Sequence, residues 1–344
     1  MDNVTSSELF ELEVGLPDER LEVRGRRLIG LPKRYERLRR ELRLLLDLEG
    51  VEAWSKKLYG WRVPLVDVAA DRYPLVIFHG DVGTGKTETA EVASDALARE
   101  LDREARLFKL STRVRGSGNV GQMSMLINQA FDVVTKEAGK KKLSFLIVDE
   151  ADSLAANRSG DRSHHEDKVA VNTLIQKIDD VRGFGGRVLV FLFTNRFEAL
   201  DTAMVRRAGR VERFDRPDET ERDQLLRLDL DGLGLPEKTL KDLVTLTGPD
   251  GNGRPLGFTY SDLRTRLFPE ALARAFPDRK VEPRDLLDIK AYYMGLAGCE
   301  WDKTTSSKLP SALQPSRPQT HNALEDAQAQ AEIFKKLLAE SQKQ

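Results

Sequence analysis

The chain is 344 residues long, enough for two or three domains, and 40% of its residues are hydrophobic. Its 55 basic and 56 acidic side chains give a net charge of −1, which excludes a global field that would draw it to nucleic acid or to an anionic membrane. The single cysteine excludes an internal disulfide, and the acidic start and short apolar runs predict a cytoplasmic protein without a membrane partner.

Residues 1–70 are expected to form an N-terminal segment with an amphipathic helix at 32–48. One face of this helix carries four leucines, Leu38, Leu42, Leu45 and Leu46. The opposite face is rich in arginine and is expected to be solvated. A nucleic-acid-binding helix is the alternative, against which Glu36 and Glu41 interrupt the positive charge.

Residues 71–217 alternate short apolar runs with longer helical patterns, which predicts an α/β domain built on a parallel sheet. Five strands are expected, at 75–79, 106–110, 143–148, 188–193 and 211–214. Flanking helices are expected at 87–101, 122–137 and 167–178.

The strand pattern stops after Pro217, and residues 218–298 are expected to form an all-helical lid domain. Its helical stretches lie at 219–228, 237–246, 261–276 and 283–296. Residues 299–321 include a Ser-, Pro- and Thr-rich stretch and are expected to be a linker, followed by a C-terminal helix in 322–344.

Residues 80–87, with the sequence GDVGTGKT, match the phosphate-binding loop G-x-x-x-x-G-K-[ST] between an apolar strand and a helix. Lys86 would reach the β and γ phosphates of ATP, and Thr87 would hold Mg²⁺. Backbone N–H groups would converge on the phosphates from Gly80, Gly83, Thr84 and Gly85. The alternative interpretation is an ordinary Gly-rich turn between a strand and a helix.

Asp149 and Glu150 follow the apolar run 145–148. A parallel sheet would bring both carboxylates to the edge where the phosphate-binding loop lies. We expect Asp149 to complete the Mg²⁺ site and Glu150 to orient or deprotonate the attacking water. Acids at a strand end are also common as solvated caps, so the acid pair alone does not indicate a catalytic site. Together with the phosphate-binding loop upstream it does.

The next strand ends at Thr194 and Asn195, where the Asn195 amide could hold the same water or could cap a helix. The order of these motifs, with an arginine-rich segment and a helical domain after them, resembles that of the AAA+ ATPases over residues 73–296. By this resemblance Asn195 is the first sensor residue.

Residues 203–213 resemble the AAA+ segment that presents arginine fingers to the nucleotide of the neighbouring subunit. Such an arginine stabilises the charge of the transferring phosphoryl group. We expect Arg207 and Arg210 in this role, and Arg206 and Arg213 in surface ion pairs, although the sequence leaves the choice open. The resemblance implies a homo-oligomeric ring, in this family a hexamer.

Two shorter matches extend the resemblance around the nucleotide. Ile29 and Gly30 lie where AAA+ proteins pass a loop along the adenine, but such a triplet is also an ordinary turn. In the lid, the family register places Ser261 where a second sensor arginine is expected, and Arg264 lies one turn further on as a candidate.

The loop at 111–121 is where AAA+ proteins carry the pore loop that grips a polypeptide. Asn119 and Val120 replace the usual aromatic, which puts strong threading in doubt. A second polar loop at 156–167 would also face the pore; its adjacent histidines, His164 and His165, are expected to be polar loop groups rather than metal ligands.

Within the AAA+ proteins, residues 148–178 and 194–217 look most like the ATPases that remodel HORMA-domain proteins. These include eukaryotic checkpoint remodellers and bacterial relatives in cyclic-oligonucleotide (CBASS) anti-phage systems. The resemblance implies that the protein partner is a HORMA-domain protein, whose closed state is opened so that a signal is switched off.

Two other functions stay open. A nucleic-acid-associated AAA+ ATPase, of the loader or transposition-regulator type, is disfavoured by the balanced charge and by the lack of an appended basic domain. A nucleotide-binding scaffold without hydrolysis is disfavoured by the presence of Lys86, Asp149 and Glu150.

Residues 318–327 resemble the last motif of DEDD-type 3′–5′ exonucleases, in which His321 would be the general base and Asp326 a metal ligand. That chemistry needs two metal ions held by further acids, and the remaining length does not fit such a domain. We therefore expect a docking helix with an apolar face, formed by Leu324, Ala327, Ala331, Phe334 and Leu338.

Overall fold

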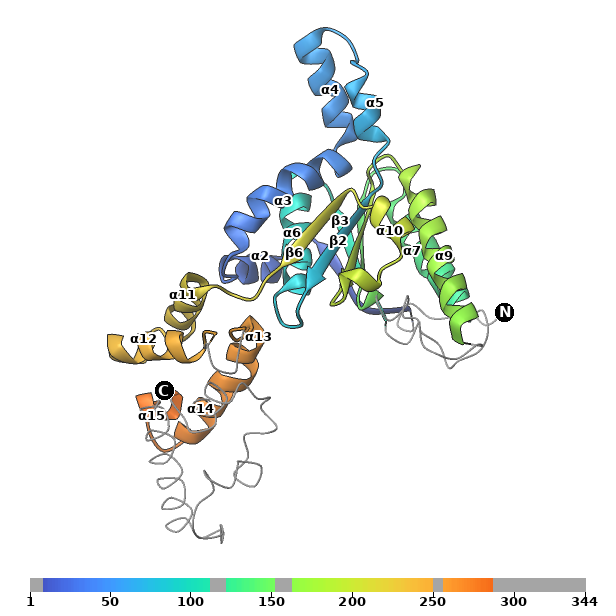
Figure 1. Ribbon diagram of the computed structural model, residues 1–344. Helices are drawn as coiled ribbons and strands as arrows, with labels where there is room; N and C mark the ends of the chain where they lie inside the picture. The colour runs from blue at the N-terminus through green and yellow to red at the C-terminus, as the bar shows by residue number, and fades with distance from the viewer. Residues whose placement is uncertain (1–8, 112–121, 152–162, 250–255, 287–344) are drawn as a thin grey trace. The chain divides into compact units, whose positions relative to one another are not determined.

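The computed structural model describes residues 9–111, 122–151, 163–249 and 256–286. The chain divides into two compact units, residues 1–215 and 216–344. The first unit is built on a six-stranded sheet with the order β1-β3-β4-β5-β2-β6 (Figure 1). Its strands are β1 (Phe10–Leu16), β2 (Leu75–Gly80), β3 (Ala105–Leu110), β4 (Leu143–Val148), β5 (Val188–Thr194) and β6 (Arg210–Phe214).

All five expected strands are present as β2 to β6, and they are parallel to one another. The expected count of five was nevertheless one short, because β1 pairs antiparallel with β3. The sequence of β1, FELEVGL, alternates apolar and mostly acidic residues, and its burial alternates along the middle of the strand. This period-2 pattern is the signal of an edge strand with one covered face.

Helices cover both faces of the sheet, as the parallel strands require. One face is covered by α2 (Glu19–Arg26), α3 (Leu31–Leu46) and α6 (Lys86–Glu100); the other is covered by α7 (Gln122–Ala138) and α9 (Ser163–Arg182). Strand β2 contributes alternate residues to the two cores, Leu75 and Ile77 to one, Val76 and Phe78 to the other. The helix expected at 32–48 is confirmed as α3.

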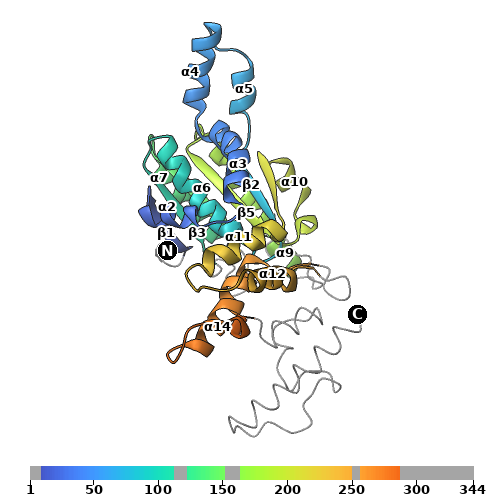
Figure 2. The ribbon, with the colours of Figure 1, turned by 90° about the vertical axis from the view of Figure 1, so that its left-hand side faces the viewer.

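A helical hairpin projects from the first unit, as the two views in Figures 1 and 2 show. It consists of α4 (Leu48–Tyr59) and α5 (Leu65–Ala70), which lie between α3 and β2 in the chain. The sequence analysis did not predict this hairpin. After β5 in the chain, a short 3₁₀ turn (Phe197–Ala199) and α10 (Thr202–Arg206) lead into β6.

The second unit is helical throughout the residues described in it, as expected. It contains α11 (Glu219–Asp229), α12 (Glu237–Leu246), α13 (Tyr260–Asp262), a π-helical turn (Leu263–Leu267), α14 (Phe268–Ala275) and α15 (Pro283–Leu286). Asp218 begins α11 with a capping box to Glu221. The expected linker at 299–321 and C-terminal helix at 322–344, with His321 and Asp326, lie outside the described residues.

No helix in the described part of the chain has both the length and the apolar character that a membrane span requires.

Candidate nucleotide-binding site

Three neighbouring strands end at the expected nucleotide site. In the sheet, His79 of β2 lies beside Thr194 of β5, and Val148 of β4 lies beside Leu192. Adjacent strands are about 4.8 Å apart. The phosphate-binding loop, Asn195 and Asp149 therefore leave the sheet at one edge, as the sequence analysis expected.

The glycines of the loop adopt backbone conformations that other residues rarely take. Gly80, Gly83 and Gly85 have φ angles of 141°, 76° and 91°. A Cβ on Gly80 would lie 2.1 Å from the carbonyl oxygen of Phe214, whereas a Cβ on Gly85 would meet nothing within 4 Å. The loop is thus packed against β6 at its start, and there is open space beside Gly85, where α6 begins. This open cradle at a helix N-terminus fits a phosphate group.

Lys86 joins the loop to the end of β5. Its ammonium donates hydrogen bonds to the carbonyl oxygens of Gly80 (2.7 Å) and Asp81 (2.8 Å), and to Oδ1 of Asn195 (2.9 Å). Only 8% of Lys86 is exposed. These three bonds fix the ammonium between the phosphate-binding loop and the end of β5, which is the position expected for a lysine that binds phosphate.

The acid pair begins where β4 ends. The backbone N–H of Glu150 donates to Oδ1 of Asp149 at 2.8 Å. Glu150 has a φ angle of 49°, in the left-handed region that costs a residue with a side chain about 1–3 kcal/mol. Asp102, for which no role is expected, has a similar φ angle of 50°, so the role of Glu150 stays a prediction.

Lys109, at the end of β3, is a site neighbour that the sequence analysis missed. Its Nζ lies 3.6 Å from Oδ2 of Asp149 and 2.5 Å from Oε1 of Glu11 in β1. Burial alone would lower the pKa of Lys109, but the hydrogen bond to Glu11 and the charge of Asp149 raise it overall. The lysine therefore stays charged beside the carboxylate expected to hold Mg²⁺.

The oxygen ligands expected for Mg²⁺ fit a hard cation. Thr87 lies in the first turn of α6 and is half-buried, and Asp149 has 30% of its side chain exposed. A hydroxyl and a carboxylate, completed by water and phosphate oxygens, are the ligands that Mg²⁺ prefers.

The two expected finger arginines lie near the amino ends of the parallel strands, whereas the phosphate-binding loop follows the carboxyl end of β2. Arg207 pairs with Asp179 of α9 at 2.6 and 3.1 Å, and Arg210 pairs with Glu212 at 2.7 Å and with Glu41 at 3.3 Å. Arg213 makes the expected surface ion pair, with Asp215.

The sheet register shows how far these arginines are from the loop of their own subunit. Arg210 lies beside Val76, four residues before Gly80, which corresponds to about 13 Å along the strand. The guanidinium of Arg207 lies 5.6 Å from the ring of Tyr73, which precedes β2. Both arginines therefore sit at the amino ends of the strands, whereas the nucleotide loop sits at the carboxyl ends.

A family model described as ATPase family associated with various cellular activities (AAA) matches residues 76–216. CD-NTase-associated protein 6 from Escherichia coli strain KTE188 is 50% identical over 287 residues, which cover 83% of this chain and 96% of that protein. The chain belongs to the AAA ATPase family. A protein of the same name from E. coli strain MS 115-1 is 40% identical over 290 residues, which cover 82% and 93% of the two chains.

Solved structures of AAA ATPases show the same relationship. A chain of the E. coli MS115-1 HORMA:CdnC:Trip13 complex has 39% identity and a TM-score of 0.75, over 83% of this chain and 96% of that one. Rhizobiales Trip13 has 33% identity and a TM-score of 0.61, over 84% and 98%. The PCH-2 protein of C. elegans, at 17% identity and a TM-score of 0.58, shares the fold.

The remaining expected site residues of this AAA ATPase fall into three groups. Ile29 and Gly30 precede α3, and Gly30 has a φ angle of 71°. Arg34 follows one turn later, and its guanidinium lies 4.3 Å from the ring of Phe214. Phe214 is also the residue whose carbonyl oxygen lies against Gly80. Arg264 belongs to the second unit and pairs with Asp229 at 2.6 and 3.1 Å. Residues 112–121 of the first expected pore loop and 156–162 of the second lie outside the described residues, as do the side chains of His164 and His165. The second loop was expected to extend to residue 167, but α9 begins at Ser163, so residues 163–167 are helical.

Proposed function

We propose that this AAA ATPase hydrolyses ATP in a homohexameric ring in the cytoplasm and uses the energy to open a HORMA-domain protein in bacterial anti-phage signalling. The observation that carries the ATPase is the bond from Lys86 to Asn195, which joins the phosphate-binding loop to the expected sensor strand. The likeness to CD-NTase-associated protein 6, and to a chain of the HORMA:CdnC:Trip13 complex, supports the substrate class.

In the proposed mechanism, Lys86 and the N–H groups of the loop bind the phosphates of ATP. Thr87 and Asp149 hold Mg²⁺, which when bound neutralises charge on the phosphates. Glu150 accepts a proton from the attacking water, and Asn195 orients that water. We expect a further cation to stabilise the charge of the transferring phosphoryl group, as in other phosphoryl-transfer enzymes.

We propose that Arg207, together with Arg210, supplies that cation from the neighbouring subunit. Support comes from the position of both arginines at the edge of the sheet opposite their own loop. Hydrolysis then depends on assembly, and each turnover can move one subunit against the next. We assign the ATPase domain to residues 71–217 and the lid to 218–298, with Arg264 as the candidate second sensor and Ile29–Gly30 as the adenine contact.

The test is a pull-down from the native host with Glu150→Gln in ATP, followed by mass spectrometry. This variant should keep ATP bound and trap the substrate, whereas the Lys86→Ala control should not bind nucleotide and should recover nothing. Recovery of a HORMA-domain protein supports the proposal. DNA-bound proteins alone would favour the loader or transposition-regulator type, and ATP binding by the wild type without turnover would favour a scaffold.

A further inference from the structure

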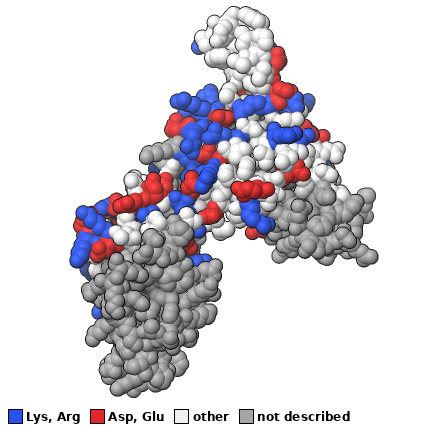
Figure 3. Space-filling view, in the orientation of Figure 1, with Lys and Arg blue, Asp and Glu red and all other residues white. Residues whose placement is uncertain are grey.

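The projecting hairpin carries a concentration of exposed apolar side chains. Fifteen large apolar side chains are exposed among the described residues, and six of them lie within residues 54–68. They are Trp54, Leu58, Tyr59, Trp61, Leu65 and Val68, with 42% to 63% of each residue exposed. On the face drawn in Figure 3 the hairpin shows few charged side chains, and a belt of charged side chains lies below it. Single exposed apolar residues are ordinary, but a cluster of this kind marks an interaction surface.

The hairpin is an ordered support for these side chains. Ser55 is fully buried; its hydroxyl donates to the carbonyl of Trp61 at 2.8 Å and accepts from the N–H of Val63 at 2.9 Å. Gly60 ends α4 with a φ angle of 79°. The rings of Trp54 and Tyr59 meet edge to face at 5.5 Å. The bonds of the connecting loop thus hold the apolar surface in one shape.

The base of the hairpin is linked to the segment that carries Arg207. Asp71, after α5, pairs with Arg182 of α9. The guanidinium groups of Arg182 and Arg207 lie 5.0 and 5.6 Å from the ring of Tyr73, and Arg207 pairs with Asp179, one turn from Arg182.

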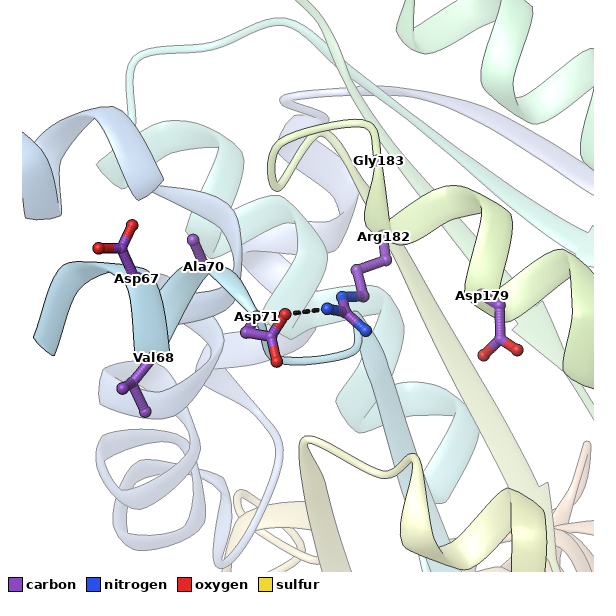
Figure 4. Close-up of a pocket in the computed structure, with 7 residues that line it drawn as sticks. All are labelled: Asp67, Val68, Ala70, Asp71, Asp179, Arg182 and Gly183. Atoms are coloured by element: carbon purple, nitrogen blue, oxygen red, sulfur yellow. Dashed lines mark hydrogen bonds and ion pairs between the residues drawn. The ribbon is translucent and has the colours of Figure 1, made fainter. Parts of the chain in front are cut away.

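Figure 4 shows α5 and the end of α9 on two sides of an open hollow of about 660 Å³. It is lined by Asp67, Val68, Ala70, Asp71, Asp179, Arg182 and Gly183. Val68 belongs to the apolar surface and Asp179 holds Arg207. Val68 of the hairpin and Asp179, the partner of Arg207, therefore line the same hollow.

We propose that the hairpin docks on the neighbouring copy of this chain and thereby holds Arg207 at the nucleotide of that copy. The inference rests on the proposed function, since Arg207 can act only on a nucleotide bound by another subunit. A stable interface needs roughly 800 Å² from each partner and apolar anchors at its centre, in which Trp and Tyr are favoured. The finger segment offers mainly charge, and the adjoining hairpin supplies the apolar part.

The first test replaces two exposed side chains of the hairpin, in the variant Leu58→Glu/Val68→Glu. Both residues are 63% exposed, so the fold should be retained in circular dichroism. In ATP and the Glu150→Gln background, sedimentation velocity should show self-association weakened by about 30-fold or more, as for loss of a hot spot. Val23→Glu/Leu272→Glu, at exposed apolar sites outside the hairpin (57% and 58%), should assemble normally. Trp61→Ala, which introduces no charge, should weaken assembly in the same direction.

A mixing experiment then tests whether the hairpin and Arg207 of one subunit act together on the nucleotide of its neighbour. The hairpin variant keeps its own nucleotide site, so adding Glu150→Gln subunits, with intact hairpin and Arg207, should restore ATP hydrolysis. Subunits with both Glu150→Gln and Arg207→Ala should not restore it.

Normal rings and normal hydrolysis in the hairpin variant would overturn the inference while leaving the ATPase intact. If that variant also failed to capture its protein substrate, the surface would belong to the substrate instead. A wild-type protein that hydrolyses ATP as a monomer would overturn the proposed ring itself.

Discussion

Asn195 is the residue that connects the phosphate-binding loop with the next strand, through its bond to Lys86. We predict that Asn195→Ala lowers kcat by about 10- to 100-fold, because the lysine and the attacking water lose a fixed partner. ATP affinity should change little, since the loop and Lys86 remain. Steady-state hydrolysis and titration with a fluorescent ATP analogue measure both quantities. Asn128→Ala is the control, because this amide bonds only to the backbone of its own helix in the structure. An unchanged kcat would leave Asn195 without the sensor role.

Glu150 is the expected general base. Glu150→Gln keeps the size of the side chain and removes its negative charge, so we predict that hydrolysis falls by about 100-fold or more while ATP stays bound. Single-turnover hydrolysis of radiolabelled ATP measures the loss. The control is Glu137→Gln. Glu137 lies in α7 and pairs with Arg106 and Lys142, so this variant should hydrolyse ATP normally. Normal hydrolysis by Glu150→Gln would show that another group activates the water.

The loop and the acid pair could be predicted because their chemistry fixes both residue type and spacing. Lys109 could not, since a single lysine at a strand end has no motif. Its partner Glu11 lies in β1, and only the pairing of β1 with β3 brings the two together. The ion pair of Arg207 with Asp179 could not be predicted either, because the two residues are 28 positions apart in the sequence and meet only in the folded structure.

At the scale of elements, β1 is the strand that the sequence analysis missed. Its alternation of apolar and mostly acidic residues is short, and only the pairing of β1 with β3 shows that it belongs to the sheet. Phe10 is 5% exposed and its ring lies 4.8 Å from that of Phe108. We predict that Phe10→Ala lowers the free energy of unfolding by about 3–5 kcal/mol, measured by urea denaturation. Val23→Ala, at a residue that is 57% exposed, should change it by less than about 0.5 kcal/mol. If Phe10→Ala lowered the free energy of unfolding by no more than Val23→Ala does, β1 would not contribute to the core.

The turn from β2 into α6 depends on Gly80. A Cβ there would lie 2.1 Å from the carbonyl oxygen of Phe214, and the φ angle of 141° disfavours any side chain. We predict that Gly80→Ala displaces the loop and weakens ADP binding by at least about 10-fold, which is a cost of 1.4 kcal/mol. Isothermal titration calorimetry measures the affinity. Gly15→Ala, where a Cβ meets nothing within 4 Å, should bind ADP normally. Equal affinities would show that the loop tolerates the shift.

At the scale of the whole molecule, the succession of an α/β unit and a helical unit could be predicted from the change in pattern near Pro217. The projecting hairpin could not, because tryptophans and leucines suggest a buried face, whereas six large apolar side chains of residues 54–68 are exposed in the structure. The same holds for the position of the arginines. Their role in trans stays a prediction from resemblance; what the sheet register adds is that Arg210 lies at the amino ends of the strands, away from the loop of its own subunit.

The central claim, that a nucleotide is hydrolysed with an arginine from the next subunit, is tested most directly by the rate of hydrolysis per subunit as a function of protein concentration. We predict that this rate rises with concentration to a plateau, and that Arg207→Ala lowers the plateau by about 1,000-fold. Arg213→Ala, which removes a surface pair with Asp215, should leave it unchanged. A rate per subunit that is independent of concentration and survives Arg207→Ala would contradict the account.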